Sequence, residues 1–311
     1  MSKIFITGIN GFVGKHLLNV YPDDKIFGLV KSSTGEDLGS NVKVLSGDIL
    51  DANRIHEIVE EIKPDIIFHL AALTSPGESL KTPVETINNN VSGQLNILEA
   101  VRKIELNCKM LVVSSAEVYG NVDERSIPTS ENAELLPNTP YGVSKAAQDL
   151  LGYQYNKSYG LFNIRVRPFN HIGPGQAPIF VVPAFAKQIA MIEKGQQENI
   201  IKVGNLAPKR DFTDVRDVVR AYKLLIEKGT AGEVYNIGSG KSLPISQILD
   251  ILLSFSDEEI DVVEDPSLVR KVDVNELRCD FSKLNRETGW EPEIPIEESL
   301  RDTLDYWRNI L

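Results

Sequence analysis

The sequence predicts an α/β protein built on a doubly wound parallel sheet, with a smaller α/β region towards the carboxyl end. Two observations support this fold class. Short apolar runs alternate with helical segments over the first 170 residues, as expected when helices connect parallel strands. A glycine-rich turn also follows the first apolar run and opens the first helical segment, the usual position of a phosphate-binding turn.

The elements follow from the residues in turn. Residues 3–7 form a short apolar run and predict the first strand, and the pattern of residues 11–20 predicts the first helix. The run at 65–70 is largely apolar and predicts a buried strand. The other elements expected in this part are, in chain order, strands at 26–30 and 42–45, a helix at 52–62, a helix at about 83–103, a strand at 110–114, a helix that contains Tyr141 and a strand at 162–166.

The alternation weakens beyond His171, where proline and glycine become frequent. The pattern there predicts a helix at 182–195, a strand at 200–203 and a helix at 215–228. Neither an internal repeat nor a low-complexity linker separates the two parts of the chain. We therefore expect the carboxy-terminal part to pack directly on the first domain.

Composition excludes several classes of function. The 311 residues have a net charge of −11, which argues against a nucleic-acid surface because such binding needs clustered Lys and Arg. No apolar run approaches the roughly 20 residues of a membrane span, and a strand that begins at Lys3 leaves no room for a signal peptide. Cys108 and Cys279 are too few for a disulfide framework or a cysteine-based zinc site. We expect a cytoplasmic protein without a metal.

The glycine-rich turn predicts a dinucleotide site. Gly8 permits the tight turn out of the strand, Gly11 lets the backbone approach a pyrophosphate, and Gly14 lets the helix pack closely on the strand. Asp48, after the third strand, is placed to read an adenine amine. The small residues at 70–72 form a turn beside the cofactor at the end of the fourth strand.

Cofactor preference depends on the end of the second strand. An acidic residue there would bind a ribose diol and repel a 2′-phosphate. This chain has Lys31, Ser32 and Ser33 instead, and a cation with two hydroxyls suits a 2′-phosphate. NADP(H) is therefore favoured, with NAD(H) as the alternative.

The catalytic candidates are Ser115, Tyr141 and Lys145. A lysine four residues after a helical tyrosine lies on the same face, where its ammonium can lower the pKa of the phenol. An unperturbed tyrosine with a pKa near 10 exchanges protons poorly at neutral pH. Ser115 would bond the substrate oxygen, Tyr141 would act as acid or base, and Lys145 would also bind the nicotinamide ribose.

These motifs resemble those of the extended short-chain dehydrogenase/reductases, the NAD-dependent epimerase/dehydratase family, in the branch that acts on nucleotide sugars. The resemblance covers nearly the whole chain. Its motifs are GINGFVG at 8–14, HLAA at 69–72, NVSG at 90–93, Ser115 with Tyr141 and Lys145, RPFN at 167–170, RDFTDVRD at 210–217 and YNIGSG at 235–240.

The resemblance implies a Rossmann domain over residues 1–170, which carries the catalytic groups, and a mainly nucleotide-sugar-binding region over residues 171–311, with interleaved segments. The cofactor contacts that it implies are Gly8, Asn10, Gly11, Phe12, Val13, Gly14, Lys31, Ser32, Asp48, Ile49, Leu70, Ala71, Ala72, Tyr141, Lys145, Pro168 and His171. The substrate contacts that it implies are Asn170, Val181, Lys187, Val203, Arg210 and Arg270. Many relatives have proline after the last of these arginines, where this chain has Lys271.

The branch depends on the residues after Ser115. Dehydratases acting on dTDP-glucose have adjacent Asp and Glu there, and those acting on GDP-mannose have a hydroxyl residue before the Glu. This chain has Ala116 and Glu117, so it keeps a carboxylate but has no proton donor beside it. The motifs at 167–176, 180–189 and 203–206 are most similar to those of the GDP-4-keto-6-deoxy-D-mannose reductases that form GDP-D-rhamnose.

We therefore expect NADPH-dependent reduction of a C4 ketone on a nucleotide-diphosphate sugar, GDP-linked in preference to other bases. A GDP-mannose 4,6-dehydratase with Glu117 as the C5 base is the second interpretation, and a 4-epimerase is the third. A cofactor-sensing binding protein on the same fold is the non-enzymatic alternative. Relatives commonly dimerise by pairing the Tyr141 helix and the 83–103 helix into a four-helix bundle, which implies a homodimer.

Overall fold

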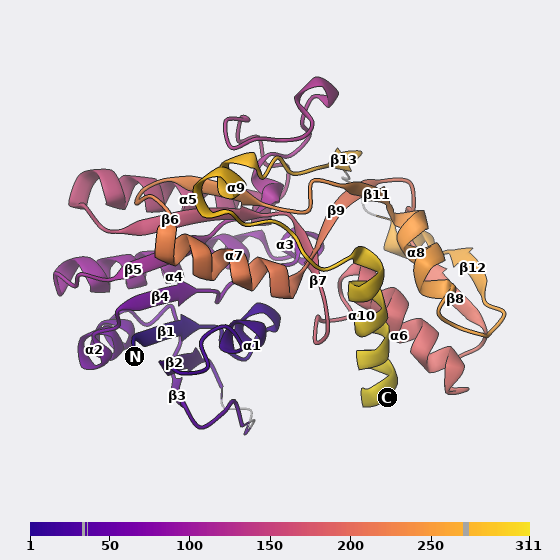
Figure 1. Cartoon of the computed structure of the whole chain (residues 1–311), viewed down its shortest axis with the longest axis horizontal. Coiled ribbons are helices and arrows are strands. Elements are labelled where there is room, and N and C mark those ends of the chain that lie inside the picture. Colours follow the sequence, from indigo (N-terminus) through magenta and orange to yellow (C-terminus); the bar gives the residue numbers. More distant parts are fainter. Residues whose placement is uncertain (33–34, 36, 270–273) are drawn as a thin grey trace.

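A seven-stranded sheet forms the centre of the larger part of the molecule. The structure is a computed structural model that describes residues 1–32, 35, 37–269 and 274–311. All neighbouring strands of the sheet are parallel, in the order β10-β6-β5-β4-β1-β2-β3 (Figure 1). The strands are β1 (Lys3–Thr7), β2 (Lys25–Val30), β3 (Val42–Ser46), β4 (Ile66–His69), β5 (Lys109–Val113), β6 (Asn163–Pro168) and β10 (Val234–Ile237).

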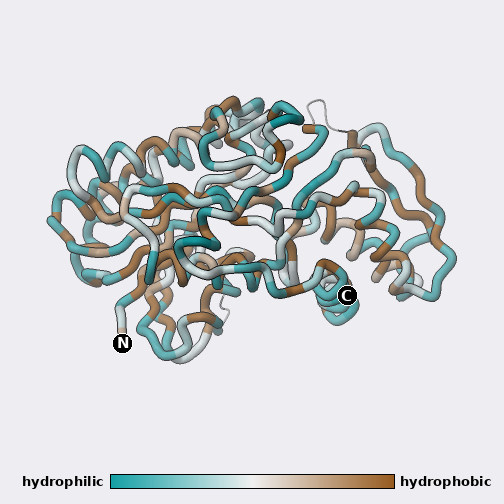
Figure 2. Tube along the Cα trace, turned by 45° about the horizontal axis from the view of Figure 1, so that its top comes forward, coloured by the Kyte–Doolittle hydropathy of each residue, from teal (hydrophilic) through white to brown (hydrophobic). Residues whose placement is uncertain are grey.

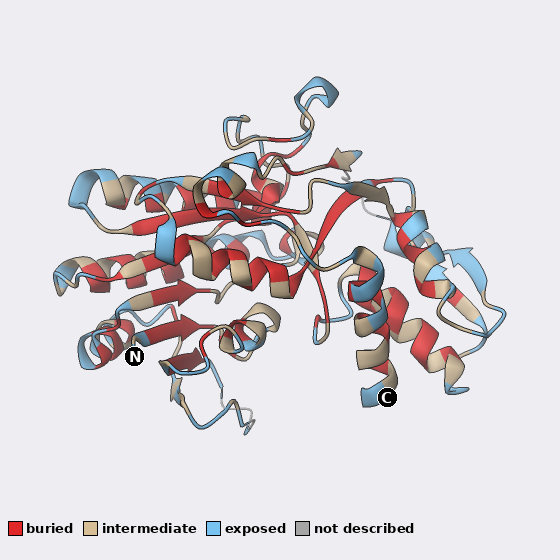
Figure 3. Ribbon diagram, in the orientation of Figure 1, coloured by how far each residue is buried: buried red, intermediate tan, exposed pale blue. Residues whose placement is uncertain are grey.

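Helices cover both faces of this sheet. The helices concerned are α1 (Phe12–Leu18), α2 (Ala52–Ile62), α4 (Pro83–Lys103), α5 (Pro140–Tyr159) and α7 (Val215–Lys228). In β1, Ile4 and Ile6 pack in one core cluster with residues of α1 and α7, whereas Phe5 packs in another with residues of α2 and α4. The alternating side chains of one strand thus join both layers, and the central strands are the most buried part of the molecule (Figure 3).

The first strand lies where the direction of winding changes. β2 and β3 extend the sheet on one side of β1, and β4, β5 and β6 extend it on the other. In open parallel sheets, ligands bind outside the carboxyl ends of the strands at such a point. A ligand is therefore expected at the turns that follow β1 and β4.

A second region lies beside the carboxyl ends of the central strands (Figure 1). β9 (Lys209–Asp214) pairs with β7 (Asn170–Ile172), β11 (Ser242–Pro244) and β13 (Glu276–Leu277), while β8 (Ile200–Val203) pairs with β12 (Asp261–Glu264). The helices α6 (Val181–Glu193), α8 (Ile245–Leu253) and α10 (Ile296–Ile310) pack around a separate core cluster. Figure 2 shows that the last turns of α10, beside the C label, are mostly hydrophilic. The buried side chains of this helix include Leu300, Leu304 and Trp307.

Short elements complete the part of the chain that the structure describes. They are α3 (Pro76–Ser79), α9 (Ser282–Thr288) and three 3-10 turns, η1 (Ala116–Val118), η2 (Glu124–Ser126) and η3 (Pro266–Leu268). The element α3 lies next to the start of α5, and η1 directly follows Ser115. Both therefore border the region where the catalytic candidates lie.

The expected fold class is confirmed, and α2, α4, β8 and α7 begin and end at the predicted residues. The first helix is shorter than expected, because it begins only at Phe12 and ends at Leu18. β10 was not predicted from the sequence, and it joins the central sheet although it follows the expected boundary at residue 170. The other elements without a sequence prediction are β7, β9, β11 to β13, α3 and α8 to α10.

Candidate active site

The turn between β1 and α1 packs against the turn that follows β4. Gly8 has a φ of +72°, and a Cβ there would lie 2.9 Å from the backbone nitrogen of Ala71. A Cβ at Gly14 would lie 2.5 Å from the carbonyl oxygen of Ile9. Both of these neighbouring atoms belong to the backbone and cannot move away by a side-chain rotation, so only glycine fits at these two positions.

The amino terminus of α1 is open to a ligand. Gly11 occupies the N-cap position, where it supplies no side chain to accept hydrogen bonds from the first turn. Unpaired N–H groups and the helix dipole at such an end favour a phosphate. These features fit the pyrophosphate of a dinucleotide.

The carboxyl ends of β1 and β4 are joined by side chains. Thr7 and His69 share a hydrogen bond of 2.8 Å between Oγ1 and Nδ1, and the Ala71 N–H donates to the same threonine oxygen at 3.2 Å. Burial, reinforced by the positive charge of Lys145, lowers the pKa of His69 to about 3. His69 is therefore a neutral structural group that holds the two turns together at neutral pH.

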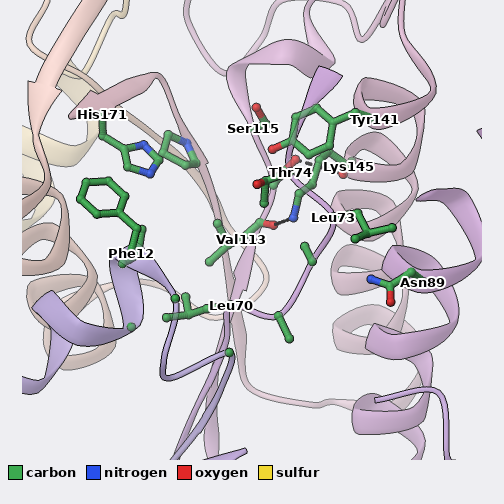
Figure 4. A pocket seen from close by; sticks show the side chains of 18 of the residues that line it. Phe12, Leu70, Leu73, Thr74, Asn89, Val113, Ser115, Tyr141, Lys145 and His171 are labelled. Atoms are coloured by element: carbon green, nitrogen blue, oxygen red, sulfur yellow. Dashed lines mark hydrogen bonds between the residues drawn. The ribbon is translucent and has the colours of Figure 1, made fainter. Parts of the chain in front are cut away.

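The three catalytic candidates converge on one cavity. Ser115 follows β5, whereas Tyr141 and Lys145 occupy successive turns of α5. The Lys145 ammonium donates to the carbonyl of Val113 at 2.8 Å and lies 5.9 Å from the centre of the Tyr141 ring. Figure 4 shows these groups together on one side of the cavity.

Burial governs the protonation of this group. It raises the pKa of Tyr141 well above 10, an effect that a hydrogen bond with Ser115 opposes and the charge of Glu117 reinforces. It lowers the pKa of Lys145 to about 7. The shift of Tyr141 is opposite to the lowering expected from Lys145, because loss of water around the phenol outweighs the other influences. At neutral pH Tyr141 is a neutral phenol with a proton to donate.

An aromatic pair forms the opposite side of the cavity. Phe12, at the start of α1, and His171, in β7, are parallel with ring centres 6.0 Å apart (Figure 4). The His171 Nδ1 lies 3.1 Å from the carbonyl oxygen of Phe169, and burial lowers the pKa of its ring. This pair gives the cavity a flat, uncharged wall.

The cavity has a volume of about 500 Å³ and brings together most of the predicted cofactor and catalytic residues with one predicted substrate contact, Asn170. Those that line it are Gly8, Asn10, Gly11, Phe12, Val13, Gly14, Lys31, Asp48, Ile49, Leu70, Ala71, Ala72, Ser115, Glu117, Tyr141, Lys145, Pro168, Asn170 and His171. Other lining residues were not predicted as site residues, among them Thr74, Pro76, Asn89, Gln176 and Phe180. Only the glycines and prolines around Gln176 marked that stretch as a loop.

The ends of β2 and β3 form a charged corner of this cavity. The ammonium of Lys31 lies 2.9 Å from a carboxylate oxygen of Asp48, and the Leu50 N–H donates to the other oxygen at 3.0 Å. The hydrogen bond between the two side chains raises the pKa of Lys31, while the bond from Leu50 is the main cause that lowers the pKa of Asp48. Ser32 is exposed beside them, whereas Ser33 lies outside the described residues.

The predicted substrate contacts fall into two groups. Asn170 lines the cavity, and buried Arg210 on β9 donates to the carbonyl of Val274 at 2.6 Å. Among the residues that the structure describes, Arg210, Val181, Lys187 and Val203 lie outside the cavity lining, and Arg270 lies outside the described residues. The Lys187 ammonium lies 5.3 Å from the centre of the Trp307 ring, and Val203 is buried in the core around α6.

Over residues 1–32, 35, 37–269 and 274–311, no group of three or more His, Cys, Asp or Glu side chains could hold a metal ion. Within the same ranges, every helix is too short or too polar to cross a membrane.

Comparison with known proteins connects this geometry to chemistry. A sequence model of the family described as GDP-mannose 4,6 dehydratase matches residues 5–303. The chain is 36% identical over 308 residues to the GDP-6-deoxy-D-mannose reductase of Pseudomonas aeruginosa. The aligned residues make up 99% of this chain and 98% of that protein.

Solved structures agree with the fold. The structure of RMD from Pseudomonas aeruginosa complexed with NADPH superposes with a TM-score of 0.88 at 35% identity, covering all of both chains. The UDP-glucose 4-epimerase of Thermotoga maritima with UDP-glucose superposes with a TM-score of 0.90 at 29% identity, covering 99% of both chains.

Proposed function

Because this chain belongs to the GDP-mannose 4,6-dehydratase family, the nucleotide-sugar branch expected from its motifs, we propose that it reduces the C4 ketone of GDP-4-keto-6-deoxy-D-mannose to GDP-D-rhamnose. The observation that carries the proposal is the convergence of Ser115, Tyr141 and Lys145 on the cavity that the glycine-rich turn enters. The full-length similarity to a GDP-6-deoxy-D-mannose reductase supports ketone reduction over dehydration.

The cofactor is NADP(H), and the described residues fit it. The narrow turns at Gly8 and Gly14 and the open end of α1 suit the pyrophosphate, while Lys31 suits a 2′-phosphate. When bound, the reduced nicotinamide supplies the hydride for the ketone carbon. The similar structure of RMD from Pseudomonas aeruginosa, which contains NADPH, supports this preference over NAD(H).

Tyr141 acts as the general acid in this reaction. Its raised pKa keeps the phenol protonated at neutral pH, so it can protonate the oxygen that becomes an alkoxide as the ketone is reduced. Ser115 donates a hydrogen bond to the same oxygen. The Lys145 ammonium stabilises the negative charge that develops in the transition state, where an interaction accelerates the step most.

The nucleotide sugar extends from the cavity towards the second region. Asn170 is the contact within the cavity, and Arg210 supplies a cation for the diphosphate. We keep Val181, Lys187, Val203 and Arg270 as proposed contacts further along the same ligand. The division at residue 170 into a cofactor-binding and a mainly substrate-binding part belongs to the same proposal.

We also propose a homodimer formed through α4 and α5. Several large apolar side chains on these helices are exposed, namely Val84, Ile87, Val143, Leu150 and Tyr153. Pairing the two helices with those of a second copy would remove this surface from water. A cytoplasmic location is part of the proposal, and it agrees with the two buried free thiols at Cys108 and Cys279.

Glu117 favours one competing function, the dehydratase. Glu117 lines the cavity, and its charge is close enough to Tyr141 to raise the pKa of the phenol. A dehydratase would use such a carboxylate to remove the C5 proton of GDP-mannose. A reductase needs Glu117 only as a polar wall.

Two parallel incubations test the proposal. One follows the absorbance of NADPH with the 4-keto substrate, and the other follows GDP-mannose alone by chromatography. We expect NADPH consumption, no conversion of GDP-mannose, and much of the ketone reduction retained in Glu117→Gln. Conversion of GDP-mannose to a 4-keto product, abolished by Glu117→Gln, would replace the reductase with the dehydratase.

A further inference from the structure

The backbone N–H of Tyr141 is bonded to a side chain outside its own helix. The first N–H groups of a helix have no partner within it. In α5, Pro140 has no N–H, and the Thr139 hydroxyl accepts from Gly142 at 3.0 Å. The Tyr141 N–H donates to the hydroxyl oxygen of Ser79 at 3.1 Å, a residue 62 positions earlier in the chain.

The direction of both hydrogen bonds of Ser79 is determined by their partners. The Tyr141 N–H can only donate, so the Ser79 oxygen accepts, and the Ser79 hydroxyl donates to the carbonyl of Pro76 at 2.7 Å. Ser79 is 1% exposed, so water cannot take its place. Since Pro76 lines the cavity, one hydroxyl connects the cavity wall to the catalytic helix.

The carbonyl of Tyr141 is held in a similar way. The Ser144 hydroxyl donates to this carbonyl at 2.7 Å, and the Asn90 amide donates to the Ser144 oxygen at 2.9 Å. The same Asn90 amide donates to the carbonyl of Leu73 at 3.0 Å. The two main-chain polar groups of Tyr141 are thus tied to the segment that contains Leu73, Pro76 and Ser79.

We propose that Ser79 is a positioning residue for the reaction, which sets the location of the Tyr141 phenol through the tyrosine backbone. This inference rests on the proposed role of Tyr141 as the general acid. Without the Ser79 hydroxyl, the buried Tyr141 N–H loses its acceptor, and the first turn of α5 must shift to find another. A shift of about 1 Å in a reacting group can reduce turnover by roughly 100-fold.

A first experiment tests the hydrogen bond without any substrate. Hydrogen–deuterium exchange with residue-level fragmentation measures the Tyr141 amide in the wild type, Ser79→Ala and Ser75→Ala. Ser75 is the matched control. Its hydroxyl also accepts a hydrogen bond from a backbone N–H, that of Glu78 at 3.2 Å, but this bond lies at the start of α3 and does not reach α5. We expect exchange about 5- to 10-fold faster in Ser79→Ala only, as for the loss of one hydrogen bond. Unchanged exchange in Ser79→Ala would overturn the proposal.

A double-mutant cycle tests the link to the chemistry. Ser79→Ala should lower kcat by roughly 10- to 100-fold in the wild type, with much less effect on KM. In the Tyr141→Phe background, whose residual turnover lacks the phenolic proton, it should cost less than about 2-fold, since the two changes act as one unit. An equal loss in both backgrounds would identify Ser79 as merely structural.

Two further measurements keep the outcomes separate. If Ser79→Ala does not fold, Ser79→Cys keeps the length of the side chain but offers a weaker acceptor, and the same pattern of rates is expected with smaller changes. If the wild type does not reduce the 4-keto substrate, the proposed function fails. The exchange experiment still decides whether Ser79 holds the Tyr141 backbone.

Discussion

Replacing Asp149 by asparagine should strongly destabilise the protein. Asp149 is completely buried on α5, one turn beyond Lys145, between two arginines of β6. It accepts from Arg165 Nη1 at 2.6 Å, and from Arg167 Nε at 2.7 Å and Nη2 at 3.2 Å. Both arginines are less than one-tenth exposed. Asp149→Asn would leave two buried guanidinium groups without their counter-charge.

The magnitude follows from this burial. Breaking a buried ion pair by removing one partner costs about 3–5 kcal/mol, because the remaining charge stays desolvated. For a chain of this size that corresponds to a fall in Tm of roughly 6–10 °C, at about 2 °C per kcal/mol. Because α5 also carries Tyr141 and Lys145, we expect catalytic activity to fall as well.

The assay is urea unfolding of the wild type, Asp149→Asn and Asp302→Asn. Asp302 is the matched control, because it pairs with Arg216 at 2.8 Å but both side chains are about one-third exposed. Such a pair contributes at most about 1 kcal/mol. A loss below about 1 kcal/mol in Asp149→Asn, or equal losses in both variants, would refute the argument from burial.

Three further predictions concern the cavity. Tyr141→Phe removes the proposed proton donor but keeps the ring, so turnover should fall roughly 10²- to 10⁴-fold; near-normal steady-state rates would contradict its assignment. Lys31→Asp should reverse the preference for NADPH over NADH by charge repulsion, whereas Lys43→Asp, at an exposed ion pair with Glu61, should not. Fluorescence titration measures both affinities, and equal affinities in the wild type would rule out discrimination at this corner. Burial lowers the folded pKa of Lys145 from 10.5 to about 7, so between these values the folded state binds fewer protons than the unfolded state and stability rises with pH. Lys145→Met should therefore raise Tm most below pH 7 and progressively less towards pH 10.5, and a gain that does not change with pH would contradict this view.

The parts of the fold that could be predicted are those whose pattern is local. α2 and α4 repeat their apolar residues over several turns, and their predicted bounds agree with the structure. β10 was missed because a four-residue strand is defined by its pairing with β6, from which about 65 residues separate it. Local periodicity carries no information about such a partner.

The candidate site shows the same difference between features set by local spacing and features set by distant partners. The glycine-rich turn, Ser115, Tyr141 and Lys145 have characteristic spacing, so the sequence predicted which of them meet. The ion pair between Lys31 and Asp48 depends on β2 and β3 being neighbours in the sheet. The direction of the Tyr141 pKa shift depends on burial by distant segments, which spacing does not describe.

The position of β10 has a consequence for how the chain is made. β6 is buried along its whole length, with β5 on one side and β10 on the other. A ribosome must therefore synthesise some 70 residues beyond β6 before β10 can pair with the free edge of β6. The helix α7, which packs on β5 and β6, emerges in the same interval. Until then the nascent sheet presents an edge of unpaired backbone N–H and C=O groups, which can pair with other chains. A fragment truncated near residue 170 should therefore aggregate, and the early sheet needs protection during translation.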